Sequence, residues 1–287
     1  MSTQEADSLR RHSAEISARC PLAEPAKDVP PWVIFHLPHD STLIPAEVRA
    51  QFLLTDEELQ LELCRMTDHL THALFCADAH AGTVVRARVS RLVVDVERFA
   101  DDAREPMAAR GMGAIYRKTS SLAPLRRQLT EEECSSLMRE WYHPHHLALE
   151  KAVCSALERH DRCLVLDCHS FPAEPLPYEQ RDPASIRPDI CIGTDDFHTS
   201  EATARAFVSA FSRQGWSVAL NQPFQGALVP ASRYRRDARV SAVMVEINRR
   251  LYLHEGDATP RACFEEVGAR IRASCAEAIA SVLRGKA

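Results

Sequence analysis

The 287-residue chain has no net positive charge, few aromatic residues (6%) and no apolar run of the roughly 20 residues that a membrane helix needs. Its 35 Lys and Arg against 40 Asp and Glu give a formal charge of −5, which provides no basic field to hold a nucleic acid. The N-terminus also lacks the basic and apolar regions of a secretory signal peptide. We therefore expect a cytoplasmic protein that binds neither nucleic acid nor membrane.

The ten cysteines are scattered, without a CxxC pair or the spacing of a zinc ribbon. Several of them lie inside apolar runs. Such cysteines are typical of reduced, buried thiols in a reducing compartment, and they exclude a disulfide framework. Apolar residues make up 45% of the chain and charged residues 26%, which is typical of a globular domain.

Apolar runs that read as buried strands alternate with segments of helical spacing. The predicted strands are residues 32–37, 83–89, 92–96, 163–166, 190–192, 217–220 and 243–247, and the predicted helices are residues 55–74, 130–159, 199–213 and 262–283. This alternation predicts an α/β fold whose sheet is largely parallel and covered on both faces. We expect residues 1–30 to form an N-terminal arm and residues 31–287 a single domain.

Four predicted strands end in polar residues, and the carboxyl ends of parallel strands form the usual site of an α/β fold. The residues in question are His39, Asp40, Asp95, Glu97, Arg98, Asp167, His169, Glu246 and Arg249. Two histidines and one carboxylate would make three ligands of a catalytic zinc ion, with an open position for water. A further Glu could act as base and an Arg could hold a carboxylate, so the set predicts hydrolysis of an amide in a small acidic molecule.

Seven strings carry a family resemblance over about residues 30–255: PHDSTLIP, SRLVVDVERFADD, RGMGAIYRKT, YHPHH, LDCHSFP, RPDICIGTDDFHT and VMVEINRRLY. They resemble the N-formylglutamate amidohydrolase family, which in turn resembles the zinc carboxypeptidases and the aspartoacylases. The resemblance implies a mixed sheet of about eight strands flanked by helices. It also implies hydrolysis of N-formyl-L-glutamate to formate and L-glutamate, the last step of one histidine-degradation route.

The resemblance assigns roles to matching positions. It implies that His39 and His169 bind zinc, that Glu246 is the general base and that Arg98 grips the substrate carboxylate. Glu97 stands where the related Asp-x-Asn-Arg string has Asn, so that its charge would need neutralising beside an acidic substrate.

The third zinc ligand is open, because the related enzymes use His-x-x-Glu and the residue three after His39 is Thr42. Asp40, Asp167 and Glu97 are the candidates. We favour Asp40 because it shares the loop with His39, whereas Asp167 could instead orient an imidazole.

Further residues are candidates for binding the substrate or have a structural alternative. Arg117 or Arg104 could hold a second carboxylate, and Gln225 could present its amide to the substrate, although a surface role is open for each. His145 belongs to a His-rich string that either lines the site or supports the fold. We expect His69 and His72 to lie on a solvated helix face. Other N-acyl acidic amino acids, a short peptide, or a sensor role without catalysis are alternatives for the function.

Overall fold

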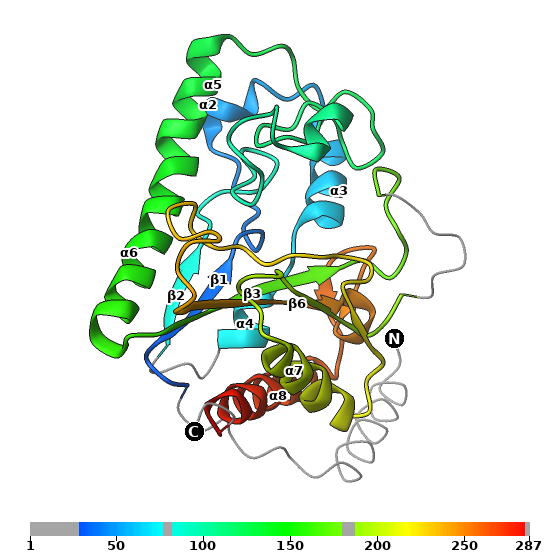
Figure 1. Cartoon of the computed structure of the whole chain (residues 1–287). Helices are drawn as coiled ribbons and strands as arrows, with labels where there is room; N and C mark the ends of the chain where they lie inside the picture. The colour runs from blue at the N-terminus through cyan, green and yellow to red at the C-terminus, as the bar shows by residue number, and fades with distance from the viewer. Residues whose placement is uncertain (1–28, 77–81, 180–186, 285–287) are drawn as a thin grey trace, which may run out of the picture.

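The computed structural model describes residues 29–76, 82–179 and 187–284 (Figure 1). Its strands are β1 (Val33–Leu37), β2 (Thr83–Arg86), β3 (Cys163–Phe171), β4 (Ile190–Gly193), β5 (Val218–Leu220), β6 (Val240–Asn248), β7 (Leu253–His254) and β8 (Thr259–Pro260). Its α-helices are α2 (Ala46–Arg49), α3 (Asp56–Met66), α4 (Thr71–Cys76), α5 (Glu131–Leu137), α6 (His143–His160), α7 (Glu201–Arg213) and α8 (Phe264–Arg284). A π-helical turn, Met138–Tyr142, joins α5 to α6.

Six strands form one sheet in the order β2-β1-β3-β6-β4-β5, and β7 pairs with β8 alone. Every pair in the large sheet is parallel except β4 with β6. The predicted α/β fold with a mixed, largely parallel sheet is therefore confirmed, although the sheet has six strands where about eight were expected. The central strands β3 and β6 are the longest, because each continues past its apolar run through polar residues that are also buried.

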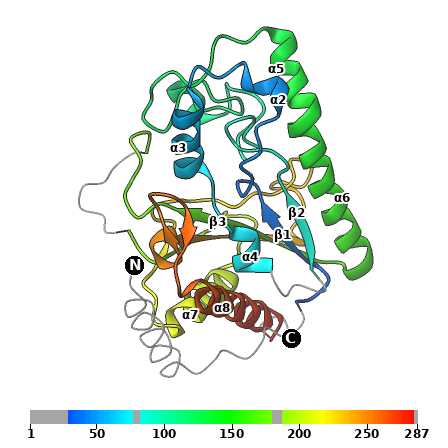
Figure 2. The ribbon, with the colours of Figure 1, turned by 180° about the vertical axis from the view of Figure 1, so that it is seen from behind.

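Helices cover both faces of the sheet. α4, α7 and α8 lie below it and α6 lies beside it on the other face, an arrangement that both views show (Figures 1 and 2). The lower layer packs Phe207 and Ile271 against Phe35, Leu166 and Val245 of the sheet. A separate apolar cluster joins α3 to the long connection between β2 and α5, above the sheet.

Two segments differ from the sequence-based prediction. Residues 92–96 are buried but form turns, because the buried guanidinium of Arg126 donates to the carbonyls of Leu92 and Val93 in place of a neighbouring strand. The predicted helix over residues 55–74 is broken into α3 and α4, with Leu70 in the left-handed region at φ 63°. The interruption is held by the backbone N–H of Asp68, which donates to the carbonyl of His39 over 2.9 Å.

Some predictions fall on the boundaries of the described residues. The predicted arm, residues 1–30, lies almost wholly outside them, and the single domain over residues 31–287 stays a prediction. The nine cysteines that the structure describes are all free thiols, as expected. In the described part of the chain, no helix is both long and apolar enough to cross a membrane.

Candidate functional site

Ionisable side chains converge where β1, β3 and β6 end, on the face of the sheet that also packs against α6. His36 lies opposite Asp167 in the register of β1 and β3, and His169 lies opposite Glu246 in the register of β3 and β6. Residues opposite each other on paired strands point to the same face. His39 follows two residues after the end of β1, so that it reaches the same place.

His39, Asp68 and His169 form a buried group that we call the histidine–aspartate cluster, with one ligand atom of each lying within 4.8 Å of the others. Nδ1 of His169 is 3.0 Å from Oδ2 of Asp68, and Nδ1 of His39 is 3.7 Å from the same oxygen. The buried Nδ1 of His39 has no hydrogen-bond partner among the described residues. An unpaired imidazole nitrogen facing a carboxylate fits a divalent metal ion, for which two imidazoles and a carboxylate are a common ligand set.

The outward-facing nitrogens of both imidazoles are held by carboxylates. Nε2 of His39 donates to Oδ1 of Asp95 over 2.8 Å, and Nε2 of His169 lies 3.1 Å from Oδ1 of Asp167 and from Oε1 of Glu97. A neutral imidazole that donates through Nε2 keeps its lone pair on Nδ1. Nδ1 of His39 can therefore turn its lone pair into the cluster, whereas Nδ1 of His169, which donates to Asp68, would give up its proton to a bound metal ion.

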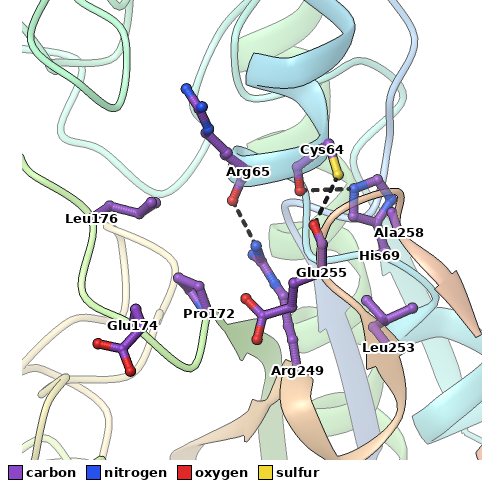
Figure 3. A pocket seen from close by; sticks show the side chains of 10 residues that line it. All are labelled: Cys64, Arg65, His69, Pro172, Glu174, Leu176, Arg249, Leu253, Glu255 and Ala258. Atoms are coloured by element: carbon purple, nitrogen blue, oxygen red, sulfur yellow. Dashed lines mark hydrogen bonds between the residues drawn. The ribbon is translucent and has the colours of Figure 1, made fainter. Parts of the chain in front are cut away.

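The third member, Asp68, is fixed from behind by Arg249. Nη2 of Arg249 donates to Oδ1 of Asp68 over 2.9 Å, and Nη1 donates to the carbonyl of Arg65 over 2.6 Å. A cavity of about 140 Å³ lies on the outer side of this guanidinium, with Cys64 and His69 in its wall (Figure 3). Because Oδ1 of Asp68 accepts from the buried Arg249, Oδ2 is the oxygen that faces the two histidines.

A second group that could hold a metal ion adjoins the first and consists of His36, Glu97 and Asp167. Here the nearest atoms already bond, since Nδ1 of His36 lies 2.7 Å from Oδ1 of Asp167. The two groups meet at His169, whose Nε2 contacts both carboxylates of the second group.

The carboxylates and the imidazoles of the site shift one another's pKa values. Burial alone would lower the pKa of His169, but the carboxylates of Glu97 and Asp167 outweigh it and raise that pKa well above its ordinary value. Burial would likewise raise the pKa of Asp68, yet the hydrogen bond from His169 and the charge of the nearby His39 hold it well below its usual range. A buried site this rich in carboxylates attracts positive charge, either as protons on the imidazoles or as a bound metal ion.

Glu246 lies beside this cluster as a buried carboxyl group with an unused oxygen. Its Oε2 lacks a hydrogen-bond partner within the described ranges. Burial raises its pKa to about 8, and the nearby Asp68 and Glu97 add to that rise while His169 opposes it. A carboxyl group with a pKa near neutrality is suited to transfer protons.

The structure brings some predicted site residues together and separates others. Glu97 reaches His169, and Nε of Arg98 lies 3.6 Å from Oδ2 of Asp95. Asp40 belongs to neither metal-binding group, because its carboxylate forms an ion pair with Arg86 at 2.9 Å. The side chains of Arg117, Arg104 and Gln225 are exposed.

The other histidines differ in their surroundings. His72 is exposed as expected, whereas His69 is half-buried and its Nε2 bonds the carbonyl of Cys64. His145 is buried, with its Nε2 lying 2.8 Å from Nε2 of His36.

Asp68 and His36 were missed by sequence reasoning. Asp68 falls in a stretch whose leucines keep helical spacing, and His36 stands inside an apolar run rather than after it. The available signal for Asp68 was a polar Thr-Asp pair within that stretch, and on its own it is weak.

The fold of this chain is similar to the folds of two solved structures. The chain resembles the crystal structure of an N-formylglutamate amidohydrolase from Ralstonia eutropha JMP134, with a TM-score of 0.78 and 23% identity over 92% of this chain and 98% of that one. It also resembles a gene product from Agrobacterium tumefaciens, with a TM-score of 0.60 and 20% identity over 89% of this chain and 91% of that one. No curated protein matches the sequence. At these identities the two structures show the fold alone.

A family model supplies the evidence of kinship. The model described as N-formylglutamate amidohydrolase matches residues 32–253, which contain the histidine–aspartate cluster, its outer carboxylates and Glu246. The match covers well over half of the chain. This chain therefore belongs to the N-formylglutamate amidohydrolase family.

Proposed function

We propose that this chain hydrolyses N-formyl-L-glutamate to formate and L-glutamate with one zinc ion held by His39, Asp68 and His169. The observation that carries the proposal is the buried Nδ1 of His39, which faces Asp68 without a hydrogen-bond partner among the described residues. Membership of the family supports the reaction class. We propose Asp68 in place of Asp40 as third ligand, because Asp40 is neutralised by Arg86.

Glu246 is proposed to move the proton. A zinc ion, when bound, supplies a Lewis acid that polarises the acyl oxygen and lowers the pKa of water. Glu246 takes the proton of the attacking water and passes it to the amine of the leaving glutamate. Positive charge in the neighbouring cluster would bring its pKa down from about 8, toward the range in which it accepts a proton at neutral pH.

Arg98 is proposed to hold a carboxylate of the substrate. Its Nε is buried without a hydrogen-bond partner in the described part of the chain, and its side chain is 23% exposed. A guanidinium that is held in place at the edge of a buried site can bind a carboxylate through two parallel hydrogen bonds. Arg117 and Gln225 stay predictions as further substrate-binding residues, since their side chains are exposed.

The test is release of formate from N-formyl-L-glutamate by the purified protein, measured after chelator treatment and again after zinc is added back. We expect release to stop with the chelator and to return with zinc. Parallel assays with N-acetyl-L-glutamate, N-succinyl-L-glutamate and a short acidic peptide report on the acyl group. Turnover of one of these alone would replace the proposed substrate, and zinc binding without turnover of any would favour a sensor.

A further inference from the structure

A chain of hydrogen bonds leads from the histidine–aspartate cluster to α6, which packs on the same face of the sheet. Oδ1 of Asp167 lies 3.1 Å from Nε2 of His169 and 2.7 Å from Nδ1 of His36, and Nε2 of His36 lies 2.8 Å from Nε2 of His145 on α6. We propose that His36 and His145 are positioning residues, which fix the proton of His169 through Asp167. The inference rests on the zinc site proposed above.

The protons of the chain can be assigned in order. Oδ2 of Asp167 accepts from the backbone N–H of Leu228 over 2.8 Å, so that Oδ1 serves both imidazoles. His36 must donate to that oxygen through Nδ1, and in the neutral ring Nε2 is then an acceptor. His145 supplies the donor that Nε2 of His36 requires. With Oδ1 held in this way, Nε2 of His169 keeps its acceptor, and a metal ion would bind at Nδ1 in place of the proton that this nitrogen donates to Asp68.

Removing the last donor would leave the arrangement undetermined. Without His145, Nε2 of His36 would be a buried acceptor without its donor, and the ring would be free to turn so that its Nδ1–H no longer points at Asp167. The carboxylate would then be free to rotate away from His169. Burial and the nearby His36 lower the pKa of His145 to about 2, which keeps the ring neutral and able to donate through one nitrogen only.

Packing alone gives little reason for two imidazoles at these positions. His36 is fully buried and His145 is 7% exposed, in a layer where Leu149 and Val153 of α6 pack on Ile34. A buried polar ring costs about 1–3 kcal/mol unless it is hydrogen-bonded, so a leucine on α6 would serve stability as well or better. The pair is therefore better explained by what it bonds to.

His198 offers a matched control. It is buried to 2% exposure and uses both ring nitrogens, since Nδ1 bonds the carbonyl of Val240 and Nε2 accepts from the backbone N–H of Arg235, each over 2.8 Å. Both of its bonds end on backbone groups. Its replacement should therefore disturb the fold as that of His145 does, without touching the metal centre.

The experiment measures zinc Kd by competition with a chromogenic chelator, together with thermal unfolding of the metal-free proteins. The variants are His145→Leu, His145→Gln and the control His198→Leu. Loss of an outer partner of a metal ligand weakens binding by about 10–100-fold, and we expect the lower end of that range for His145→Leu because it acts through two further residues. His145→Gln, whose amide can donate from the position of Nε2, should bind zinc nearly as the wild type does.

The outcomes separate the two proposals. An unchanged zinc Kd in His145→Leu, or an equal loss of affinity in His198→Leu, would overturn the positioning role while leaving the zinc site intact. A wild-type protein that binds no zinc would overturn both. If His145→Leu does not fold, His145→Asn makes the same test, because its shorter amide does not reach His36.

Discussion

Alternate residues of β3 point to opposite faces of the sheet and meet opposite environments. Leu164, Leu166 and Cys168 pack in the apolar layer with α7 and α8, whereas Asp167 and His169 on the other face bond to ionisable groups. β6 repeats the pattern, with Val245 on the apolar face beside Glu246 on the polar one. One face anchors each strand, so that the other face can carry buried charge that would not hold the fold together by itself.

Removing Asp68 should break the polar face most completely. In Asp68→Ala the histidines lose the carboxylate between them, and we expect the protein to lose its zinc and its activity to fall to background. Asp40→Asn is the control, because Asp40 pairs with Arg86 and belongs to neither group that could hold a metal ion, so this variant should keep zinc. Zinc content after gel filtration decides the matter, and stoichiometric zinc in Asp68→Ala would show that another residue is the third ligand.

Glu246→Gln should leave the metal in place and remove the base. Loss of a general base costs about 10²–10⁴-fold in rate, so kcat should fall by that factor while zinc content stays at the wild-type level. Formate release and zinc analysis on the same preparation check both statements. Full activity in this variant would remove Glu246 from its proposed role.

The difference between the two faces also explains what could be predicted from sequence. The position at or just after the end of an apolar strand identified three site residues in the sequence: His39, His169 and Glu246. Asp68 was hidden, because its neighbours Leu63 and Leu70 keep helical spacing although the helix ends at Met66. The break depends on bonds to Arg249 and to the carbonyl of His39, which are distant in sequence.

A similar limit applies to the fold. The order of strands and helices follows from local apolar spacing, and most of the predicted elements are present. Residues 92–96 were predicted as a strand because they are apolar and buried. The carbonyls of Leu92 and Val93 accept hydrogen bonds from the side chain of Arg126 rather than from another strand, and no local sequence pattern predicts such a partner.

Phe207→Ala should weaken the apolar face and spare the polar one. Phe207 is fully buried between α7 and the sheet, and removing such a ring costs about 3–5 kcal/mol of unfolding free energy. The zinc Kd should not change, because the cavity that this substitution creates lies on the face of the sheet opposite to the histidine–aspartate cluster. Chemical denaturation and zinc titration of the variant measure the two effects, and a large loss of zinc affinity would mean that the faces are coupled.

The buried carboxyl group of Glu246 should make the metal-free protein less stable as pH rises. Its pKa is raised from an ordinary 4.5 to about 8, so between those values the folded state holds a proton that the unfolded chain has released. Stability therefore falls with rising pH, by up to about 1.4 kcal/mol per pH unit. Glu246→Gln lacks this contribution. Its stability should gain on the wild type between about pH 5 and pH 8, and parallel curves would contradict the burial of this charge.

The smallest effect is expected from substitutions of two arginines, of which one lies at the site and the other on the surface. Arg98→Met removes a cation that is 23% exposed at the edge of the site, and a hydrogen bond to a charged group is worth about 1.5–3 kcal/mol, or roughly 10–150-fold in KM. Arg117→Met changes an exposed side chain that bonds only weakly to the carbonyl of Ala108, at 3.4 Å, and KM should barely move. If KM instead rose for Arg117→Met and not for Arg98→Met, the carboxylate would bind through the loop of Arg117, and that loop would have to close over the polar face during turnover.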